Sequence, residues 1–246
     1  MASIYLYGIF LPPGPVGLEL QGLDKQPVYT QEVDGLIFLY SEALQEKYLA
    51  SRRNLLGHEK VLELAMQAGY RTLLPLRFGL IVRDWETVKR QLTMLQGQGL
   101  QRLFAKLEGR REVGIKIFWD PDAELQLLLA ENRQLRAKRD GLLGKVISVD
   151  KTIAIGQALE REMRSRQEGI IEVFERTLNP LAVEVVENDT LMEKMIYNAA
   201  YIIPWDDEEK FSEEVEALDQ KFDGRLRIRY NNFTAPFNFA QLEQLE

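Results

Sequence analysis

The order of strand and helix patterns in the second half of the chain restricts its fold more than any other feature. Branched and aromatic residues predict four strands there, at residues 112–119, 181–187, 194–203 and 225–230. Helical patterns fill about residues 123–178 between the first two strands, and a further helix led by Asp206 separates the last two. This is the βαββαβ order of a ferredoxin-like fold.

The first helical stretch is longer than a single crossover helix requires. Asp120 and Pro121 favour its start, because an aspartate cap and a proline in the first turn both promote helix initiation. Gly141 and Gly144 interrupt it, which indicates that the chain turns back on itself there. We therefore expect an extended helical hairpin, a helical insertion around residues 123–178, to project from the sheet.

The first half of the chain combines strands and helices in a different order. Strands are predicted at residues 4–9 and 73–82, a hairpin at 28–40, and helices at 54–68 and 84–107. Ser41 is expected to cap a short helix that begins at Glu42.

A chain of 246 residues is long enough for two domains of about 100–150 residues each. The polar segment Gly109-Arg110-Arg111 is a suitable boundary between them. We therefore expect an α+β chain with an N-terminal α+β domain at residues 1–109 and a ferredoxin-like domain at residues 110–246.

Residue types that the chain lacks exclude several classes of site. Cysteine is absent, which excludes disulfides, thiolate zinc sites and cysteine nucleophiles and fits a reducing cytosol. His58 is the only histidine. No apolar run approaches the roughly 20 residues that cross a bilayer, and the N-terminus does not resemble a secretion signal. We therefore expect a protein that has no contact with membranes.

Clustered carboxylates are the main candidates for catalysis. An enzyme could use such carboxylates to bind Mg²⁺, and the candidates are Asp120 with Asp122 and the acidic residues 206–209. Both groups stand at predicted helix starts, where capping and the helix dipole explain them without a ligand. The sequence has no Gly-x-Ser-x-Gly elbow and no Gly-Lys-Ser/Thr phosphate loop. We therefore expect no enzyme activity, no catalytic residue, no metal and no cofactor.

Arginines at the end of the chain raise the question of nucleic-acid binding. Arg225, Arg227 and Arg229 alternate along a predicted strand, with Tyr230 and Phe233 close by, and such sheets can bind single strands. The net charge of −7 disfavours contact with phosphate backbones. We therefore favour a solvated sheet face, or one paired with an acidic helix, and expect no nucleic acid as a partner.

Two groups of residues are candidates for contact with a protein partner. In the run Leu74-Pro75-Leu76-Arg77-Phe78-Gly79, an extended backbone would direct Leu76 and Phe78 to one side and Arg77 to the other. Arg77 and Phe78 could thus contact another domain or a partner, although a plain surface arginine fits equally well.

The second group is a leucine row in the expected hairpin. Leu128, Leu135 and Leu142 repeat every seven residues, while Asn132 and Arg139 interrupt the neighbouring row. A seam that is only partly apolar suits a reversible contact better than a permanent coiled coil. The alternative is that the hairpin packs on the first domain.

Several segments, taken in order, resemble the gas vesicle protein family GvpL/GvpF over nearly the whole chain. After Tyr5-Leu6-Tyr7-Gly8-Ile9 come His58 with Val61-Leu62, the run from Leu74 to Gly79, Glu112-Val113-Gly114-Ile115-Lys116-Ile117-Phe118-Trp119, Asn198-Ala199-Ala200-Tyr201-Ile202-Ile203 and Phe211. The end of the chain departs from the family pattern, because Phe233-Thr234-Ala235-Pro236-Phe237-Asn238-Phe239 replaces Gly-Pro-x-Pro-Pro-Tyr-x-Phe.

The resemblance implies a minor component of the gas vesicle, a hollow protein shell inside the cytoplasm. Such a protein would bind the main shell protein, or other minor gas vesicle proteins, and limit shell-protein aggregation during vesicle nucleation. No catalytic residues are implied. A different reading, by analogy of fold alone, is a small-molecule-binding regulatory module with a ferredoxin-like domain.

Overall fold

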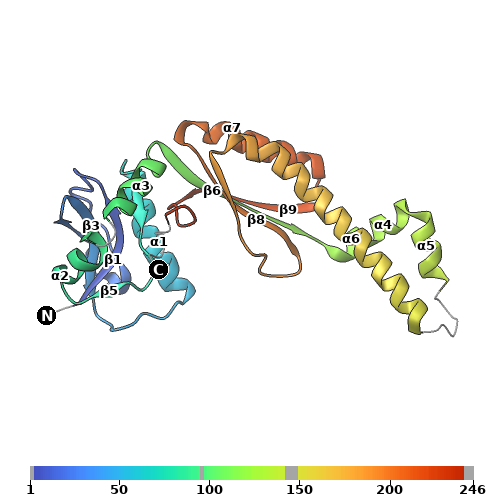
Figure 1. The fold of residues 1–246 in the computed structure, drawn as a ribbon, viewed down its shortest axis with the longest axis horizontal. Coiled ribbons are helices and arrows are strands. Elements are labelled where there is room, and N and C mark those ends of the chain that lie inside the picture. The colour runs from blue at the N-terminus through green and yellow to red at the C-terminus, as the bar shows by residue number, and fades with distance from the viewer. Residues whose placement is uncertain (1–2, 95–96, 142–148, 241–246) are drawn as a thin grey trace. The chain divides into compact units, whose positions relative to one another are not determined.

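A computed structural model describes residues 3–94, 97–141 and 149–240 (Figure 1). Contacts divide the chain into two compact units. The first unit comprises residues 1–113, 201–208 and 231–246, and the second comprises residues 114–200 and 209–230. The expected domain boundary after residue 109 stays a prediction.

The first unit is built on an antiparallel sheet in the order β2-β3-β1-β4, with β5 also paired to β1. The strands are β1 (Ser3–Phe10), β2 (Tyr29–Val33), β3 (Leu36–Ala43), β4 (Leu73–Pro75) and β5 (Ile81–Val82). The expected hairpin forms, since Val33 pairs with Leu36 around Asp34 and Gly35, which both have positive φ. Strand β2 is the outer strand at one side.

The short helix expected from Glu42 is wrong. Strand β3 continues to Ala43, and Ser41 pairs with Tyr5 of β1. The Ser41 hydroxyl lies 3.0 Å from the hydroxyl of Tyr7 instead of capping a helix. Pairing with β1 therefore outweighs the local capping preference of serine.

Side chains cap the starts of two helices of the first unit, the first of which begins two residues before the expected residue 54. Helix α1 (Arg52–Gln67) begins after Ser51, whose hydroxyl accepts a hydrogen bond from the Asn54 amide. The Asp84 carboxylate accepts one from the Thr87 amide at the start of α2 (Trp85–Val88). The single helix expected at 84–107 is instead α2, a π-helical turn (Lys89–Met94) and α3 (Gly97–Leu107).

The second sheet has the order β7-β8-β6-β9. Its strands are β6 (Arg110–Trp119), β7 (Glu184–Glu187), β8 (Met195–Pro204) and β9 (Leu226–Thr234). Strands β6 and β7 are consecutive in the chain, but β8 lies between them in the sheet. This is the split arrangement of a ferredoxin-like fold. The predicted fold class, α+β with a modified ferredoxin-like part, is confirmed.

In the described part of the chain, the α-helices beside this sheet are α4 (Pro121–Glu131), α5 (Arg133–Asp140), α6 (Val149–Leu178) and α7 (Glu208–Phe222). Figure 1 shows the C-terminal part of α6 and α7 on the same face of the sheet, where the rings of Phe174 and Phe222 stack at 5.6 Å. Short 3₁₀ turns occupy Leu23–Lys25, Asn179–Leu181 and Trp205–Asp207. Within the described ranges, no helix is both long and apolar enough to cross a membrane.

The expected helical hairpin forms, with one break that was not predicted. Asn132 separates α4 from α5, and its side-chain oxygen caps α5 by accepting a hydrogen bond 3.0 Å from the Leu135 amide. Helices α4 and α5 then pack beside α6 (Figure 1). These three helices are called the arm below. Gly144 lies outside the described residues.

Candidate functional site

The run that carries Arg77 forms a tight connection between β4 and β5. The Leu76 amide donates to the carbonyl of Tyr7 at 2.9 Å, and the Leu80 amide donates to the carbonyl of Arg77 at 3.3 Å. Gly79 completes the turn with a φ of +87°, a region that glycine enters without strain. The backbone around Arg77 is thus fixed on both sides by hydrogen bonds.

The continuous strand expected over residues 73–82 is wrong, because a turn separates β4 from β5, but the side chains of this run still differ in exposure. Leu76 is buried, Arg77 is exposed and Phe78 is half-buried. The ring centroid of Phe78 lies 6.3 Å from that of Tyr5 and 5.9 Å from that of His58. Phe78 therefore belongs to an aromatic cluster, and Arg77 is presented to solvent on the outside of it.

A hydrogen-bonded chain inside the first unit supports this connection. His58 is buried, with its Nε2 3.0 Å from the carbonyl oxygen of Leu76 and its Nδ1 2.9 Å from the hydroxyl of Tyr5. A carbonyl only accepts, so Nε2 carries the proton and Nδ1 accepts from Tyr5. The Tyr5 oxygen in turn accepts from the Gly79 amide at 3.0 Å.

Burial sets the protonation states in this chain of hydrogen bonds. It lowers the pKa of His58 to about 4, against a smaller opposing effect of the hydrogen bond to Leu76. Burial likewise raises the pKa of Tyr5. His58 is therefore neutral near pH 7 and acts as a packing and hydrogen-bonding residue.

Replacing Tyr5 by phenylalanine tests this chain of hydrogen bonds. The variant leaves the buried Nδ1 of His58 without a donor and the Gly79 amide without an acceptor. We expect the free energy of unfolding to fall by about 2 kcal/mol, the usual cost of orphaned buried polar groups. Urea denaturation measures it, and Tyr29→Phe, at a tyrosine that is 50% exposed, is the matched control with little expected change. Equal stability of both variants would contradict the assignment.

The leucine row of the arm lies inside the arm. Leu128 and Leu135 are buried, 6% and 4% exposed, and together with Leu129 they pack against Ala158, Leu159 and Met163 of α6. Leu142 lies outside the described residues. The two described leucines hold the arm together, and a direct contact between them and a partner stays a prediction.

A buried carboxylate joins the arm to the sheet of the second unit. Glu124 of α4 is 1% exposed and accepts hydrogen bonds from Arg166 of α6 and Arg225 just before β9, at 2.7 Å each. Arg166 also donates to Glu131 at 2.7 Å. Burial would raise the pKa of Glu124, but the two arginines outweigh it and lower the pKa.

The three arginines considered for nucleic-acid binding do not form one platform. Arg225 precedes β9 and binds Glu124. The guanidinium carbons of Arg227 and Arg229 lie 4.6 and 5.1 Å from the ring centroid of Phe118, in cation–π contact. All three are thus engaged within the second unit.

Large apolar side chains are exposed on the arm at other positions. Val149 and Ile153 of α6 are 73% and 52% exposed, and Leu127 of α4 is 40% exposed. Val149 and Ile153 are four residues apart and so share one face of the helix. Sequence reasoning missed them, because the seven-residue leucine spacing identified the inside of the hairpin and not its outer face.

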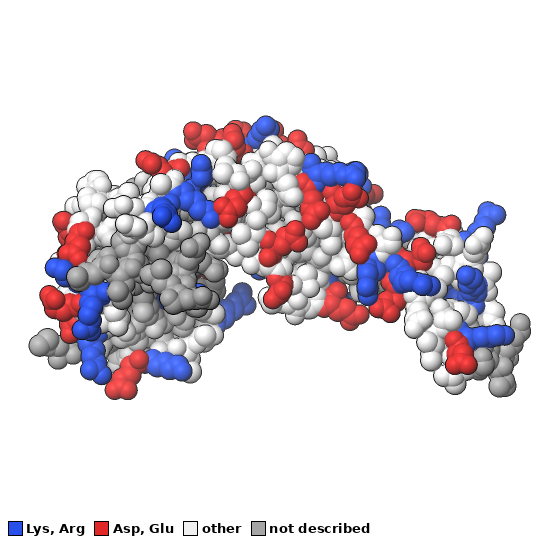
Figure 2. Space-filling model, in the orientation of Figure 1, with Lys and Arg blue, Asp and Glu red and all other residues white. Residues whose placement is uncertain are grey.

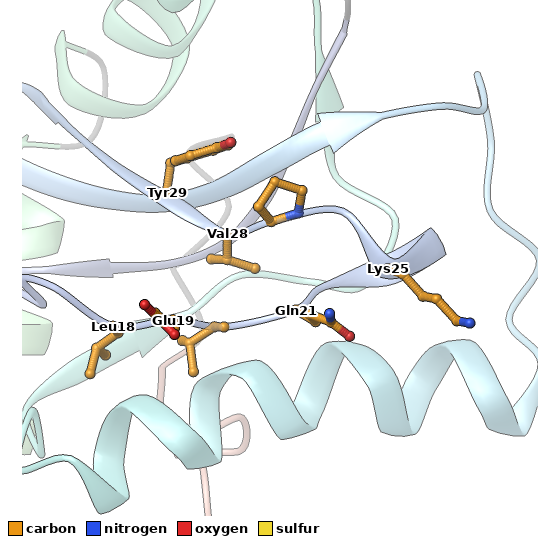
Figure 3. Close-up of a pocket in the computed structure, with 8 residues that line it drawn as sticks. Leu18, Glu19, Gln21, Lys25, Val28 and Tyr29 are labelled. Atoms are coloured by element: carbon orange, nitrogen blue, oxygen red, sulfur yellow. The ribbon is translucent and has the colours of Figure 1, made fainter.

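A hollow of about 570 Å³ in the first unit is lined by a single segment of chain (Figure 3). Its lining residues are Leu18, Glu19, Leu20, Gln21, Lys25, Pro27, Val28 and Tyr29. In Figure 3 the amino end of Lys25 points away from Glu19, so the charged groups do not converge on a ligand. Elsewhere in the described residues, no three His, Asp or Glu side chains gather as metal ligands would.

Surface charge is mixed over most of the visible face but acidic over α7 (Figure 2). That helix contains six acidic and two basic residues. Its apolar side faces inward, with Phe211, Val215 and Leu218 buried.

A second buried carboxylate, Glu112, was missed by sequence reasoning. It is 3% exposed and accepts hydrogen bonds from the amide of Asn238 at 2.9 Å and from its side-chain nitrogen at 2.6 Å. Burial raises the pKa of Glu112 to about 7, and the hydrogen bonds from Asn238 oppose the shift. An acidic residue inside a strand of branched residues was the only available signal.

The fold defines the class of protein to which the chain belongs: an α+β protein with a ferredoxin-like sheet and a helical arm. The chain matches the family "Gas vesicle synthesis protein GvpL/GvpF" over residues 3–241. It belongs to this family of gas vesicle proteins. The resemblance seen in the sequence is confirmed.

Named relatives and solved structures agree with this assignment. Gas vesicle protein F of Nostoc sp. is 59% identical over 241 residues, which cover 98% of this chain and 99% of that protein. Gas vesicle protein F of Haloferax mediterranei is 20% identical over 242 residues, 98% of this chain and 94% of that protein. The crystal structure of GvpF from Microcystis aeruginosa is 55% identical, covers 98% of this chain and all of that one, and gives a TM-score of 0.86.

Proposed function

We propose that the protein is a minor gas vesicle component that binds the main shell protein and limits its aggregation while vesicles nucleate in the cytoplasm. Membership in the gas vesicle family supplies the setting. The observation that carries the binding role is the pair Val149 and Ile153, apolar side chains exposed on one face of α6. Exposed apolar groups of this kind mark surfaces for protein contacts.

The construction of the arm supports this role. Leu128 and Leu135 close its interior, and Glu124 binds Arg166 inside the arm and Arg225 beside the sheet. A partner would therefore meet a preformed surface, which reduces the entropy cost of binding. The hollow in Figure 3 has no converging polar groups, so it does not favour the alternative of a small-molecule-binding module.

The test is to mix purified shell protein with this chain and to follow light scattering. We expect scattering to fall and the two proteins to migrate together on a sizing column. Ile153→Asp should abolish the effect, because it places a charge on the apolar face. Leu191→Asp is the matched control, since Leu191 is 74% exposed but lies outside the arm. Unchanged scattering with the unmodified chain would contradict direct action on the shell protein.

Arg77 and Phe78 provide a second contact in this proposal. Arg77 is exposed on a backbone fixed by hydrogen bonds, and no core contact depends on its charge. We expect Arg77→Ala to change the free energy of unfolding by less than about 0.5 kcal/mol, as surface substitutions usually do. The same variant should weaken co-migration with the shell protein or with another gas vesicle protein. Loss of folding without a specific effect on binding would make Arg77 a structural residue.

A further inference from the structure

The end of the chain packs into the first unit as a compact turn. Residues 235–240, called the tail here, lie beside α1 (Figure 1). The amides of Phe239 and Ala240 donate to the carbonyl of Pro236 at 3.2 and 2.9 Å, and the amide of Phe237 donates to that of Ala235 at 2.8 Å. The donors and acceptors of these backbone hydrogen bonds all lie within the tail, so a separate peptide of the same sequence could form them too.

Side chains of the tail enter sites provided by three elements of the first unit. Phe239 is 2% exposed, with the amino group of Lys106 of α3 5.3 Å from its ring centroid. The ring of Phe237 lies 6.2 Å from that of His58 of α1. Asn238, between them, donates twice to Glu112 of β6. Each of the three tail residues Phe237, Asn238 and Phe239 thus contacts a specific side chain of the first unit.

Glu112 is the polar centre of this groove. Its two oxygens each accept one hydrogen bond from Asn238, one from the backbone amide and one from the side-chain nitrogen, and only the second is specific to asparagine. The nearby Glu59 of α1 accepts from the Thr234 hydroxyl at 3.3 Å. The hydrogen bond from the Asn238 side chain requires an amide group at this position and depends on geometry, which makes this contact selective.

We propose that the groove formed by α1, α3 and the start of β6 is a peptide-binding site for an aromatic-asparagine-aromatic segment. In this chain the tail occupies the groove as a detachable ligand. The tail opens and closes without unfolding of the first unit. A separate peptide of the same sequence therefore competes with the tail for the groove. This proposal does not depend on the identity of the vesicle partner.

Hydrogen exchange on the unmodified chain tests whether the tail detaches. The amides of Phe237, Asn238, Phe239 and Ala240 are all hydrogen-bonded, so their exchange reports opening. We expect them to exchange at least about 100-fold faster than the amides of β1, through local opening of the tail alone. Exchange of both sets at one common rate would show that the tail is part of the global core and would overturn the proposal.

Competition in trans tests the groove itself. The probe is a fluorescent peptide with the sequence of residues 233–240, and its anisotropy is measured against the full chain. The linked tail has a high effective concentration, so the unmodified chain should bind the peptide weakly. In the Asn238→Ala chain the tail loses the hydrogen bond from the asparagine side chain to Glu112 and keeps the one from the backbone amide, and we expect the peptide to bind about tenfold more tightly.

A peptide in which alanine replaces the asparagine is the control for selectivity. We expect it to bind both chains at least about tenfold more weakly than the unaltered peptide, because Glu112 then lacks the hydrogen bond from the asparagine side chain. Equal binding of the two peptides, or no binding of the unaltered peptide to the Asn238→Ala chain, would refute the peptide site. Circular dichroism of the Asn238→Ala chain confirms beforehand that it is folded.

Discussion

Glu124→Gln should destabilise the second unit by about 3 kcal/mol, the lower end of the cost of breaking a buried ion pair from one side. The carboxylate is 1% exposed and accepts hydrogen bonds from Arg166 and Arg225. An amide offers only one accepting oxygen and no charge, so two guanidinium groups would remain without their anion. Urea denaturation followed by circular dichroism measures the loss.

Glu131→Gln is the matched control for this prediction. Glu131 binds the same Arg166, but its side chain is 62% exposed. Water can replace its contacts, so we expect little change in stability. If the two variants lost the same amount of stability, the burial of Glu124 would have no energetic importance. A sharp loss for Glu124→Gln alone would show that the arm depends on this carboxylate.

The second large effect expected is a dependence of stability on pH that originates at Glu112. Burial raises its pKa from 4.5 to about 7, so between these values the folded chain holds a proton that the unfolded chain has released. The stability from this group is fully present below pH 4.5 and is lost as the pH rises through 7. The loss amounts to about 3 kcal/mol at pH 8.

Glu112→Gln separates this effect from those of other carboxylates. Asp84, Glu124 and Glu131 have lowered pKa values, so they contribute the opposite trend. The quantity to measure is the stability difference between the unmodified and Glu112→Gln chains at pH 5 and at pH 8. We expect it to move by about 3 kcal/mol in favour of the variant at pH 8. A difference that is the same at both pH values would contradict a buried, titrating Glu112.

Local signals in the sequence predicted the ferredoxin-like arrangement, because residues typical of helix starts, strands and turns mark where each element begins and ends. Asp120 with Pro121 begins α4, and the strand patterns at both ends of the insertion are unambiguous. The helical hairpin followed from length and from glycine positions. Such features depend on residues close together in the chain, which sequence patterns record directly.

The errors and omissions concern contacts between distant residues. Ser41 has the properties of a helix cap, but pairing with β1, more than 30 residues away, places it in a strand. Glu112 and Asn238 are 126 residues apart, and no periodicity links them. The leucine row predicted an apolar seam in the arm but did not show that the side chains of α6 pack against it. Long-range pairing leaves no local pattern, so only the folded chain reveals it.

One outer strand of each sheet has a consequence for the proposed contact with a self-assembling shell protein. Strand β2 has five residues, most of them exposed, and includes Glu32; strand β7 has four residues and carries Glu184 and Glu187 at its ends. Short, charged outer strands are poor templates for adding another strand. A protein whose outer strands paired with those of the shell protein would be incorporated into the growing shell. In the role proposed above, strands β2 and β7 would help to keep the protein from being added to the shell as a further subunit.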